Sequence, residues 1–134
     1  MNLDISPLAG ALDSLEKAIQ RSLKEPQDDM IRDSVIQRFE YSYELCWKML
    51  KRQLEQDVAT PASLDAMSFK ELIREGAERS YIQNPEHWFV YRSQRNITSY
   101  TYNAEKAESV HKTAIHFLPD ARNLFEALQQ KNQA

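Results

Sequence analysis

The chain has 134 residues, 42% of them hydrophobic and 28% charged, the composition of a soluble globular protein with one domain over residues 1–134. Two glycines in the whole chain argue against an all-β fold, because such a fold needs glycine at repeated turns. A net charge of -3 argues against non-specific binding to DNA or anionic membranes across the whole surface. We therefore predict an all-α protein in which any contact with nucleic acid is local.

The single cysteine, Cys46, cannot form an intrachain disulfide or a multi-cysteine metal site. We predict that it is a small core residue in a reducing compartment. The N-terminus lacks a basic segment followed by an apolar one, and the longest unbroken hydrophobic stretch, residues 88–91, is too short to span a bilayer. A cytoplasmic location is expected.

Ser6 and Pro7 predict the start of a first helix, as its N-cap and first residue, and the helix should end near Pro26. A second and longer helix should begin around Asp28 and run to about Gln56. Its apolar residues fall within an arc of roughly 160°, wide enough to meet several helices at once in a bundle. These residues are Ile31, Val35, Ile36, Phe39, Tyr43, Cys46, Trp47, Met49, Leu50 and Leu54.

Outside this arc, the second helix carries two apolar residues, Tyr41 and Leu45, which indicate a second interface, most simply a homodimer. Isolated exposed apolar residues are also common, so ordinary solvent-facing positions are the alternative. On the polar side, Glu44 and Lys48 have the i,i+4 order of a surface ion pair.

Two shorter helices follow a connection over residues 58–67. Ser68 and Glu71 have the spacing of a capping box, which predicts the start of the third helix. Asn84 and Pro85 predict the start of the fourth, as its N-cap and first residue.

The last helix is predicted from Asn103, its expected N-cap, and its apolar period continues through Pro119. Proline costs about 3 kcal/mol in a helix interior, so we expect a kink or a restart there, with both halves facing one core. Residues 129–134 should fray.

A polar and aromatic run over residues 91–102 lies between the last two helices, and no acidic residue occurs from 87 to 104. An absence of carboxylates around Arg92 and Arg95 suits an anion site, because negative charge would compete for the guanidinium groups. The run is therefore a candidate phosphate or nucleotide contact. The alternative is an ordinary solvated helix face with an aromatic anchor.

The secondary structure of this run decides which side chains converge. If the helix continued, one face would be lined by Trp88, Tyr91, Arg95, Thr98 and Tyr102. We instead expect a break near residues 100–103, which would place the run at a helix end.

Other chemistries lack their usual signatures. His111 and His116 are five residues apart, so they do not share a helical face, and no carboxylate or thiol cluster joins them or His87. The chain has no glycine-rich phosphate loop and no Gly-x-Ser-x-Gly motif. We predict no metal site and no cofactor.

Residues 95–102, Arg-Asn-Ile-Thr-Ser-Tyr-Thr-Tyr, resemble the Arg-Asn-x-x-x-His-x-Tyr signature of HEPN domains, with Tyr100 where that family has histidine. Residues 38–48 are similar to a second block found in the branch called nucleotidyltransferase substrate-binding proteins, and the resemblance extends from the first helix to Leu128. It implies an antiparallel up-and-down bundle of four or five helices that forms a homodimer. It also implies a separately encoded small nucleotidyltransferase as partner, often as a toxin and antitoxin pair.

The resemblance also implies roles for single residues. Some HEPN proteins are metal-independent ribonucleases whose composite site lies in a cleft between two subunits. Carried over, Arg95 would bind the scissile phosphate and Asn96 would hold the local geometry, while Tyr102 would be the tyrosine that the partner adenylylates. Glu40 and Tyr43 would lie beside the cleft. Further candidates are Arg92 and Thr98 for binding, Trp47 beside the cleft and Tyr100 at the catalytic position.

The tyrosine at position 100 argues against catalysis. A phenol with a pKa near 10 is a poorer base at neutral pH than imidazole, by on the order of 4 kcal/mol, although it can still donate a hydrogen bond to phosphate. We therefore expect a binding subunit, for nucleotide or RNA phosphate, that docks the nucleotidyltransferase. The alternatives are a metal-independent ribonuclease toxin, with Tyr100 in place of the histidine, and a purely structural helical adaptor.

Overall fold

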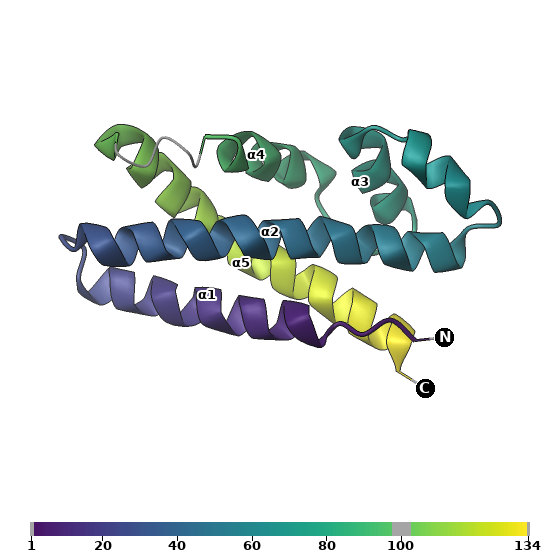
Figure 1. Ribbon diagram of the computed structural model, residues 1–134, viewed down its shortest axis with the longest axis horizontal. Helices are drawn as coiled ribbons and strands as arrows, with labels where there is room; N and C mark the ends of the chain where they lie inside the picture. Colours follow the sequence, from purple (N-terminus) through teal and green to yellow (C-terminus); the bar gives the residue numbers. More distant parts are fainter. Residues whose placement is uncertain (1, 98–102, 134) are drawn as a thin grey trace.

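The computed structural model describes residues 2–97 and 103–133, and these form an all-helical bundle, as predicted (Figure 1). The described residues contain five α-helices and one short 3₁₀ helix. The elements are α1 (Ser6–Lys24), α2 (Asp29–Asp57), η1 (Pro61–Ala66), α3 (Phe69–Glu78), α4 (Pro85–Arg95) and α5 (Ala104–Asn132). The 3₁₀ helix lies in the connection over residues 58–67, for which no secondary structure was predicted from the sequence.

Helix α2 is the centre of the bundle. It packs against all the other elements, with α1 along one side and α3 and α4 along the other, while α5 crosses it (Figure 1). Its wide apolar arc explains this position, because one helix face has to cover several neighbours. Most of the predicted arc is buried, whereas Ile31 and Trp47 are half-buried at its rim.

Aromatic packing fixes α4 on the bundle. The ring of Phe117 on α5 has three edge-to-face neighbours, with centroid distances of 5.1 Å to Phe39, 5.7 Å to Trp88 and 5.2 Å to Tyr91. Such pairs contribute about 0.5–1.5 kcal/mol each beyond their buried area. The Tyr91 hydroxyl also donates to the carboxylate of Asp120. Burial raises the pKa of this phenol, and the bond to Asp120 adds to the rise.

The helix starts follow the predicted caps with one exception. The carboxylate of Asp28 accepts N–H bonds from the first turn of α2, and Ser68 and Glu71 form the predicted capping box at α3. Ser6 is not the N-cap of α1 but its first helical residue, and its N–H and hydroxyl both bind Asp4 Oδ1. The Ser6 hydroxyl, which the N-cap prediction expected to accept a helix N–H, instead donates to the carboxylate two residues earlier.

Helix α5 continues without a restart through Pro119. The predicted N-cap, Asn103, is confirmed, since its side chain accepts the Lys106 N–H at 3.1 Å. Pro119 is exposed, while Phe117 before it and Ala121 after it are fully buried. Packing on both sides of the proline offsets the backbone hydrogen bond that it cannot make.

The C-terminal end of α5 is held by polar contacts rather than frayed as predicted. The amide of Asn132 donates to Gln53 Oε1 at 2.8 Å and accepts the Leu3 N–H at 2.7 Å. Gln53 in turn donates to Asp57 Oδ1 at 3.1 Å, and the hydroxyl of Tyr81 donates to the other oxygen of Asp57. Burial raises the pKa of Tyr81, and the bond to Asp57 adds to it. We call Gln53, Asp57, Tyr81 and Asn132 the terminal polar cluster.

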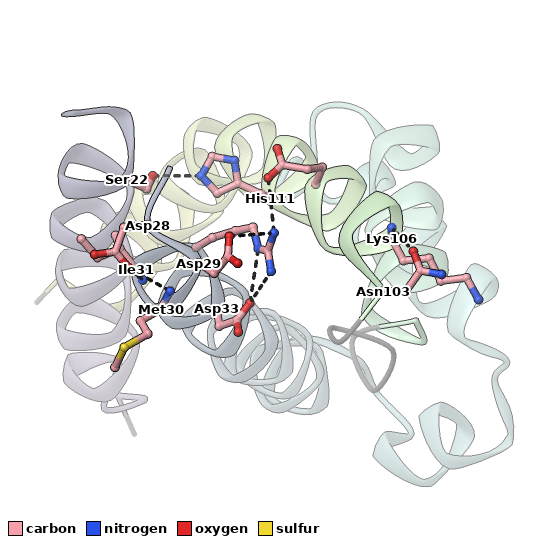
Figure 2. A network of polar contacts seen from close by, with 11 residues as sticks. Ser22, Asp28, Asp29, Met30, Ile31, Asp33, Asn103, Lys106 and His111 are labelled. Carbon is pink, nitrogen blue, oxygen red and sulfur yellow. Dashed lines mark hydrogen bonds and ion pairs between the residues drawn. The ribbon is translucent and has the colours of Figure 1, made fainter. Parts of the chain in front are cut away.

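A second network, of charged side chains, joins α2 to α5 at the other end of α2. The guanidinium of Arg32 lies 3.4 Å from Asp29, 3.3 Å from Asp33 and 3.6 Å from Glu108 on α5, and its side chain is only 13% exposed. Figure 2 shows Asp29 and Asp33 around this guanidinium. The single positive charge of Arg32 contacts three carboxylates, one of which, Glu108, lies on α5, so this network has a structural role in connecting two helices.

His111 lies next to this network on α5. Its Nε2 is 2.9 Å from the hydroxyl of Ser22 on α1 (Figure 2). Burial lowers the pKa of His111, because the charged imidazolium loses solvation there. Across the described parts of the chain, no three His, Cys, Asp or Glu side chains come together as metal ligands, and no helix is long and apolar enough to cross a membrane.

Candidate functional site

Arg95 is the last residue of α4, where it reaches over α2. Its Nε donates to Glu44 Oε1 at 3.0 Å, and one terminal nitrogen lies 3.3 Å from Glu40 Oε1. The Arg95 side chain is 31% exposed, and those of Glu40 and Glu44 are 41% and 30% exposed. The three residues therefore form a half-exposed charged group at the surface, which we call the Arg95 cluster.

The prediction that no carboxylate lies near Arg95 is wrong for the folded chain, because Glu40 and Glu44 both contact it. The neighbouring sequence, residues 87–104, contains no acidic residue. Both carboxylates come from α2, and Glu44 is 51 residues away along the chain. A local sequence window contains no information on how α4 is rotated on α2, so these partners could not be seen. The resemblance had placed Glu40 next to the site, and the structure brings the two residues together.

Glu44 has two further contacts besides Arg95. The indole N–H of Trp47 donates to Glu44 Oε2 at 3.2 Å, and the ammonium of Lys48 lies 4.0 Å from the same oxygen. The predicted i,i+4 pair is therefore confirmed, at the long end of ion-pair distance. One carboxylate oxygen holds Arg95 while the other contacts Trp47 and Lys48, so Glu44 orients the guanidinium from a fixed position.

Tyr43 lies under the cluster on the inward side of α2 and is 2% exposed. Burial raises the pKa of its phenol, while the nearby positive charges of Arg92 and Arg95 act in the opposite direction. The phenol of Tyr43 therefore stays protonated at neutral pH. Its ring centroid is 6.1 Å from that of Phe69, so it packs between α2 and the start of α3.

Helix α4 ends at Arg95, earlier than the break predicted near residues 100–103. The N–H of Asn96 closes the helix on the Arg92 carbonyl at 3.1 Å, and its side chain is exposed. The single helical face considered from Trp88 through Tyr102 would require α4 to continue beyond Arg95, where it ends, and its first two members, Trp88 and Tyr91, are buried in the core. The remaining predicted site residues, Thr98, Tyr100 and Tyr102, lie outside the described residues.

A hollow of about 260 Å³ lies between α3 and α4 and was not predicted from the sequence; we call it the α3–α4 groove. Its lining includes two half-buried phenylalanines, Phe69 and Phe89, which are covered by positive side chains. The guanidinium of Arg92 lies 4.5 Å from the Phe69 ring centroid, and Lys70 and Arg74 each lie 5.3 Å from that of Phe89. The sequence signal that could have indicated this groove is the i,i+4 spacing of Lys70 and Arg74, together with one phenylalanine on each helix, Phe69 on α3 and Phe89 on α4.

The two residues that indicated a second interface differ in exposure. Tyr41 is 39% exposed, and its hydroxyl donates to Ser14 on α1 at 3.1 Å. Leu45 is half-buried and packs against the core. Only Tyr41 therefore presents a large apolar surface on this side of α2.

Comparison of the sequence with known proteins identifies a family and a relative of nearly the same length. Residues 3–130 match the family described as "nucleotidyltransferase substrate binding protein like". The chain is 37% identical over 139 residues to a Haemophilus influenzae protein named probable ribonuclease HepT, covering 98% of this chain and 95% of that protein.

The structural matches agree with these relationships. A Haemophilus influenzae structure, described as revealing the fold of a substrate-binding domain of a nucleotidyltransferase, matches with a TM-score of 0.88 and 35% identity, over 94% of this chain and 99% of that one. A Thermus thermophilus protein has the same fold, with a TM-score of 0.75 at 23% identity over 90% and 98% of the two chains. The chain therefore belongs to the nucleotidyltransferase substrate-binding protein family, the HEPN-like branch that its sequence motifs resemble.

Proposed function

We propose that this chain is a non-catalytic, cytoplasmic substrate-binding subunit that forms a homodimer and pairs with a separate small nucleotidyltransferase, as in a toxin and antitoxin module. In this proposal the Arg95 cluster receives a phosphate of a nucleotide or of RNA. The observation that supports it most is the family match over residues 3–130. This range includes both motifs, residues 38–48 and 95–102, and all three residues of the Arg95 cluster.

The charges around Arg95 are compatible with an anion. Two carboxylates, Glu40 and Glu44, contact two cations, Arg95 and Lys48, so these four charges balance. Arg92 on the same helix as Arg95 adds one positive charge near Tyr43. A guanidinium held by a carboxylate is pre-oriented, and less side-chain entropy is lost when a ligand arrives. An incoming phosphate has to compete with Glu40 and Glu44, which predicts moderate affinity with strong dependence on salt.

The test is binding of labelled RNA and of ATP to the purified chain and to Arg95→Ala. Removing one phosphate-binding arginine should weaken binding about tenfold to a hundredfold. Arg122→Ala is a matched control, because Arg122 is 30% exposed and also pairs with two carboxylates of another helix, Asp13 at 3.0 Å and Glu16 at 3.5 Å. Equal affinity of Arg95→Ala and the unaltered chain would contradict a phosphate role for Arg95.

The partner and the dimer are tested separately from the ligand. Co-expression with the proposed small nucleotidyltransferase partner should give a complex that co-purifies, and light scattering of the chain alone should give twice the mass of one chain. Tyr41 is an exposed aromatic residue of α2, so Tyr41→Glu should shift the chain toward monomer if its face of the helix is the subunit contact. A monomeric unaltered chain at micromolar concentration would refute the dimer.

A ribonuclease is the second candidate, because the Haemophilus influenzae relative at 37% identity is named a probable ribonuclease. Its test is incubation of the purified chain with RNA in the presence of a chelator. The tyrosine at position 100 predicts no cleavage by the unaltered chain and cleavage by Tyr100→His. Cleavage that requires Arg95 in the unaltered chain would replace the binding subunit with an enzyme.

Tyr102 is the tyrosine that the family resemblance implies as the target of adenylylation. We propose that the cognate nucleotidyltransferase modifies it with ATP. Intact-mass spectrometry after incubation of the two proteins should reveal one adenylyl addition that Tyr102→Phe removes. An addition that persists in Tyr102→Phe would place the modification elsewhere.

A further inference from the structure

The α3–α4 groove combines aromatic rings with positive charge at the surface. Lys70 and Arg74 are one turn apart on α3 and both lie over the Phe89 ring, at 5.3 Å from its centroid. Like charges at this spacing repel each other, and the ring's negative face offsets part of that repulsion. Three exposed cations thus stand over two half-buried rings.

These cations are not used in ion pairs within the described residues. Over residues 2–97 and 103–133, none of Lys70, Arg74 and Arg92 forms an ion pair, whereas Arg32, Arg95 and Arg122 each have at least two carboxylate partners. Glu71, in the first turn of α3, is held by the Ser68 N–H in the capping box. The α3–α4 groove is therefore a local positive surface on a chain whose net charge is -3.

The groove lies beside the Arg95 cluster, because Arg92 lines the groove and belongs to the same last turn of α4 as Arg95. Arg92 and Arg95 are three residues apart on α4, and the charges of both act on the phenol of Tyr43. The ring of Tyr43 contacts that of Phe69, over which Arg92 is stacked. A line of positive and aromatic side chains thus runs from Arg95 through Arg92 to the groove.

We propose that the α3–α4 groove is a second nucleotide subsite, so that the ligand is a single-stranded RNA longer than one nucleotide. This inference depends on the proposed binding of phosphate at Arg95. Single strands are bound by positive grooves with stacking surfaces, and bases stack on arginine planes as well as on aromatic rings. Arg92 on Phe69 provides such a stacked plane, while Lys70 and Arg74 contact the next backbone phosphates.

The double variant Lys70→Gln, Arg74→Gln tests the subsite with oligonucleotides of different length. Its affinity for an RNA of about six nucleotides should fall about tenfold, whereas its affinity for a mononucleotide should not change. Loss of two phosphate contacts should also reduce the slope of log affinity against log salt by about 1.4 for a single strand. Both residues are exposed, so circular dichroism should show an unaltered helical fold.

The control is Lys17→Gln, Lys24→Gln, which removes the same charge from exposed positions of α1, a helix that packs on α2 and α5. Unchanged affinity of the groove variant for the long RNA, with Arg95→Ala still defective, would overturn the subsite and leave the proposed function intact. Failure of the unaltered chain to bind any RNA or nucleotide would overturn both. Loss of nucleotidyltransferase co-purification, with RNA affinity unchanged, would assign the groove to the protein partner instead.

Discussion

Two polar groups of this bundle use similar side chains in opposite ways. In the terminal polar cluster Gln53 and Tyr81 are buried, whereas Asp57 and Asn132 are half-buried, and each member is hydrogen-bonded to another group of the chain. The Arg95 cluster is about one-third exposed and carries net charge at the surface. The first joins α2, α5 and the residues after α3 into one end of the fold, whereas the second leaves charged atoms in contact with solvent.

The difference shows how a structural polar group is distinguished from a candidate binding group. Polar atoms that are buried need partners inside the protein, since an unsatisfied one costs about 1–3 kcal/mol. Ion pairs near the surface contribute less than about 1 kcal/mol and exchange partners easily. Substitutions in the terminal polar cluster should therefore change stability, and those in the Arg95 cluster should change binding.

The largest effect should follow Asp57→Ala. It leaves the buried Tyr81 hydroxyl and the Gln53 amide without their acceptor, which should lower the free energy of unfolding by about 3 kcal/mol. Urea denaturation measures this change, and RNA affinity of the folded protein should be unaltered. Lys131→Ala is the control, because its 4.0 Å contact with Asp57 is exposed and should contribute less than about 0.5 kcal/mol.

Gly76 tests how tightly α3 is held against the same end of the bundle. A Cβ added there would lie 3.0 Å from Leu50 Cδ2 and 3.1 Å from Ile82 Cγ1, and the carbonyl of Gly76 accepts the Tyr81 N–H at 2.8 Å. Gly76→Ala should therefore cost about 1 kcal/mol despite its gain in helix propensity. Gly10→Ala, with nothing within 4 Å, should instead stabilise by about 0.5–1 kcal/mol. Equal effects in thermal unfolding would contradict the close packing at α3.

Glu44→Gln sharpens the role of the Arg95 cluster. It removes a competing negative charge but keeps an oxygen that can accept the Trp47 N–H, so RNA affinity should rise about threefold to tenfold at low salt. Stability should change by less than about 1 kcal/mol. Glu16→Gln, next to Arg122, is the control and should leave affinity unchanged. A fall in affinity would mean that Glu44 contributes to the site beyond orienting Arg95.

The smallest effect concerns pH and belongs to neither cluster. The pKa of His111 is lowered by burial, so the folded chain binds its proton less readily than the unfolded chain does. Stability from neutral His111 is therefore complete above the unfolded pKa near 6.5 and is lost as pH falls below it. Unfolding at pH 7.5 and 5.5 should differ by less than about 1 kcal/mol on this account, and His111→Gln should reduce the difference.

Local features were predictable from the sequence because their causes are local. The caps of Asp28 and Asn103 and the capping box at Ser68 depend on residues within one turn of the helix start. The apolar arc of α2 predicted a bundle, because its width depends only on the spacing of hydrophobic residues. The HEPN-like motifs predicted the family for the same reason, since a motif is a local pattern.

Contacts between distant residues were not predictable. Asn132 was expected in a frayed end, because polar residues at a chain end look alike whether or not they have partners. Its partner Gln53 is 79 residues away, and only the fold brings them together. The contacts of Arg95 with carboxylates and of the cations with Phe89 were unpredictable for the same reason. Core packing decides how α4 is rotated on α2 and how α3 is rotated on α4, and a local sequence pattern does not contain this information.

The hydrogen bond between Trp47 and Glu44 gives the molecule an internal optical reporter. The chain has two tryptophans, and the other, Trp88, is 1% exposed in the aromatic core. Trp47 is half-buried, and its indole donates to the carboxylate that holds Arg95. A ligand that draws the guanidinium away from Glu44 changes the field at Trp47, so fluorescence emission can follow occupancy of the site in the unlabelled protein.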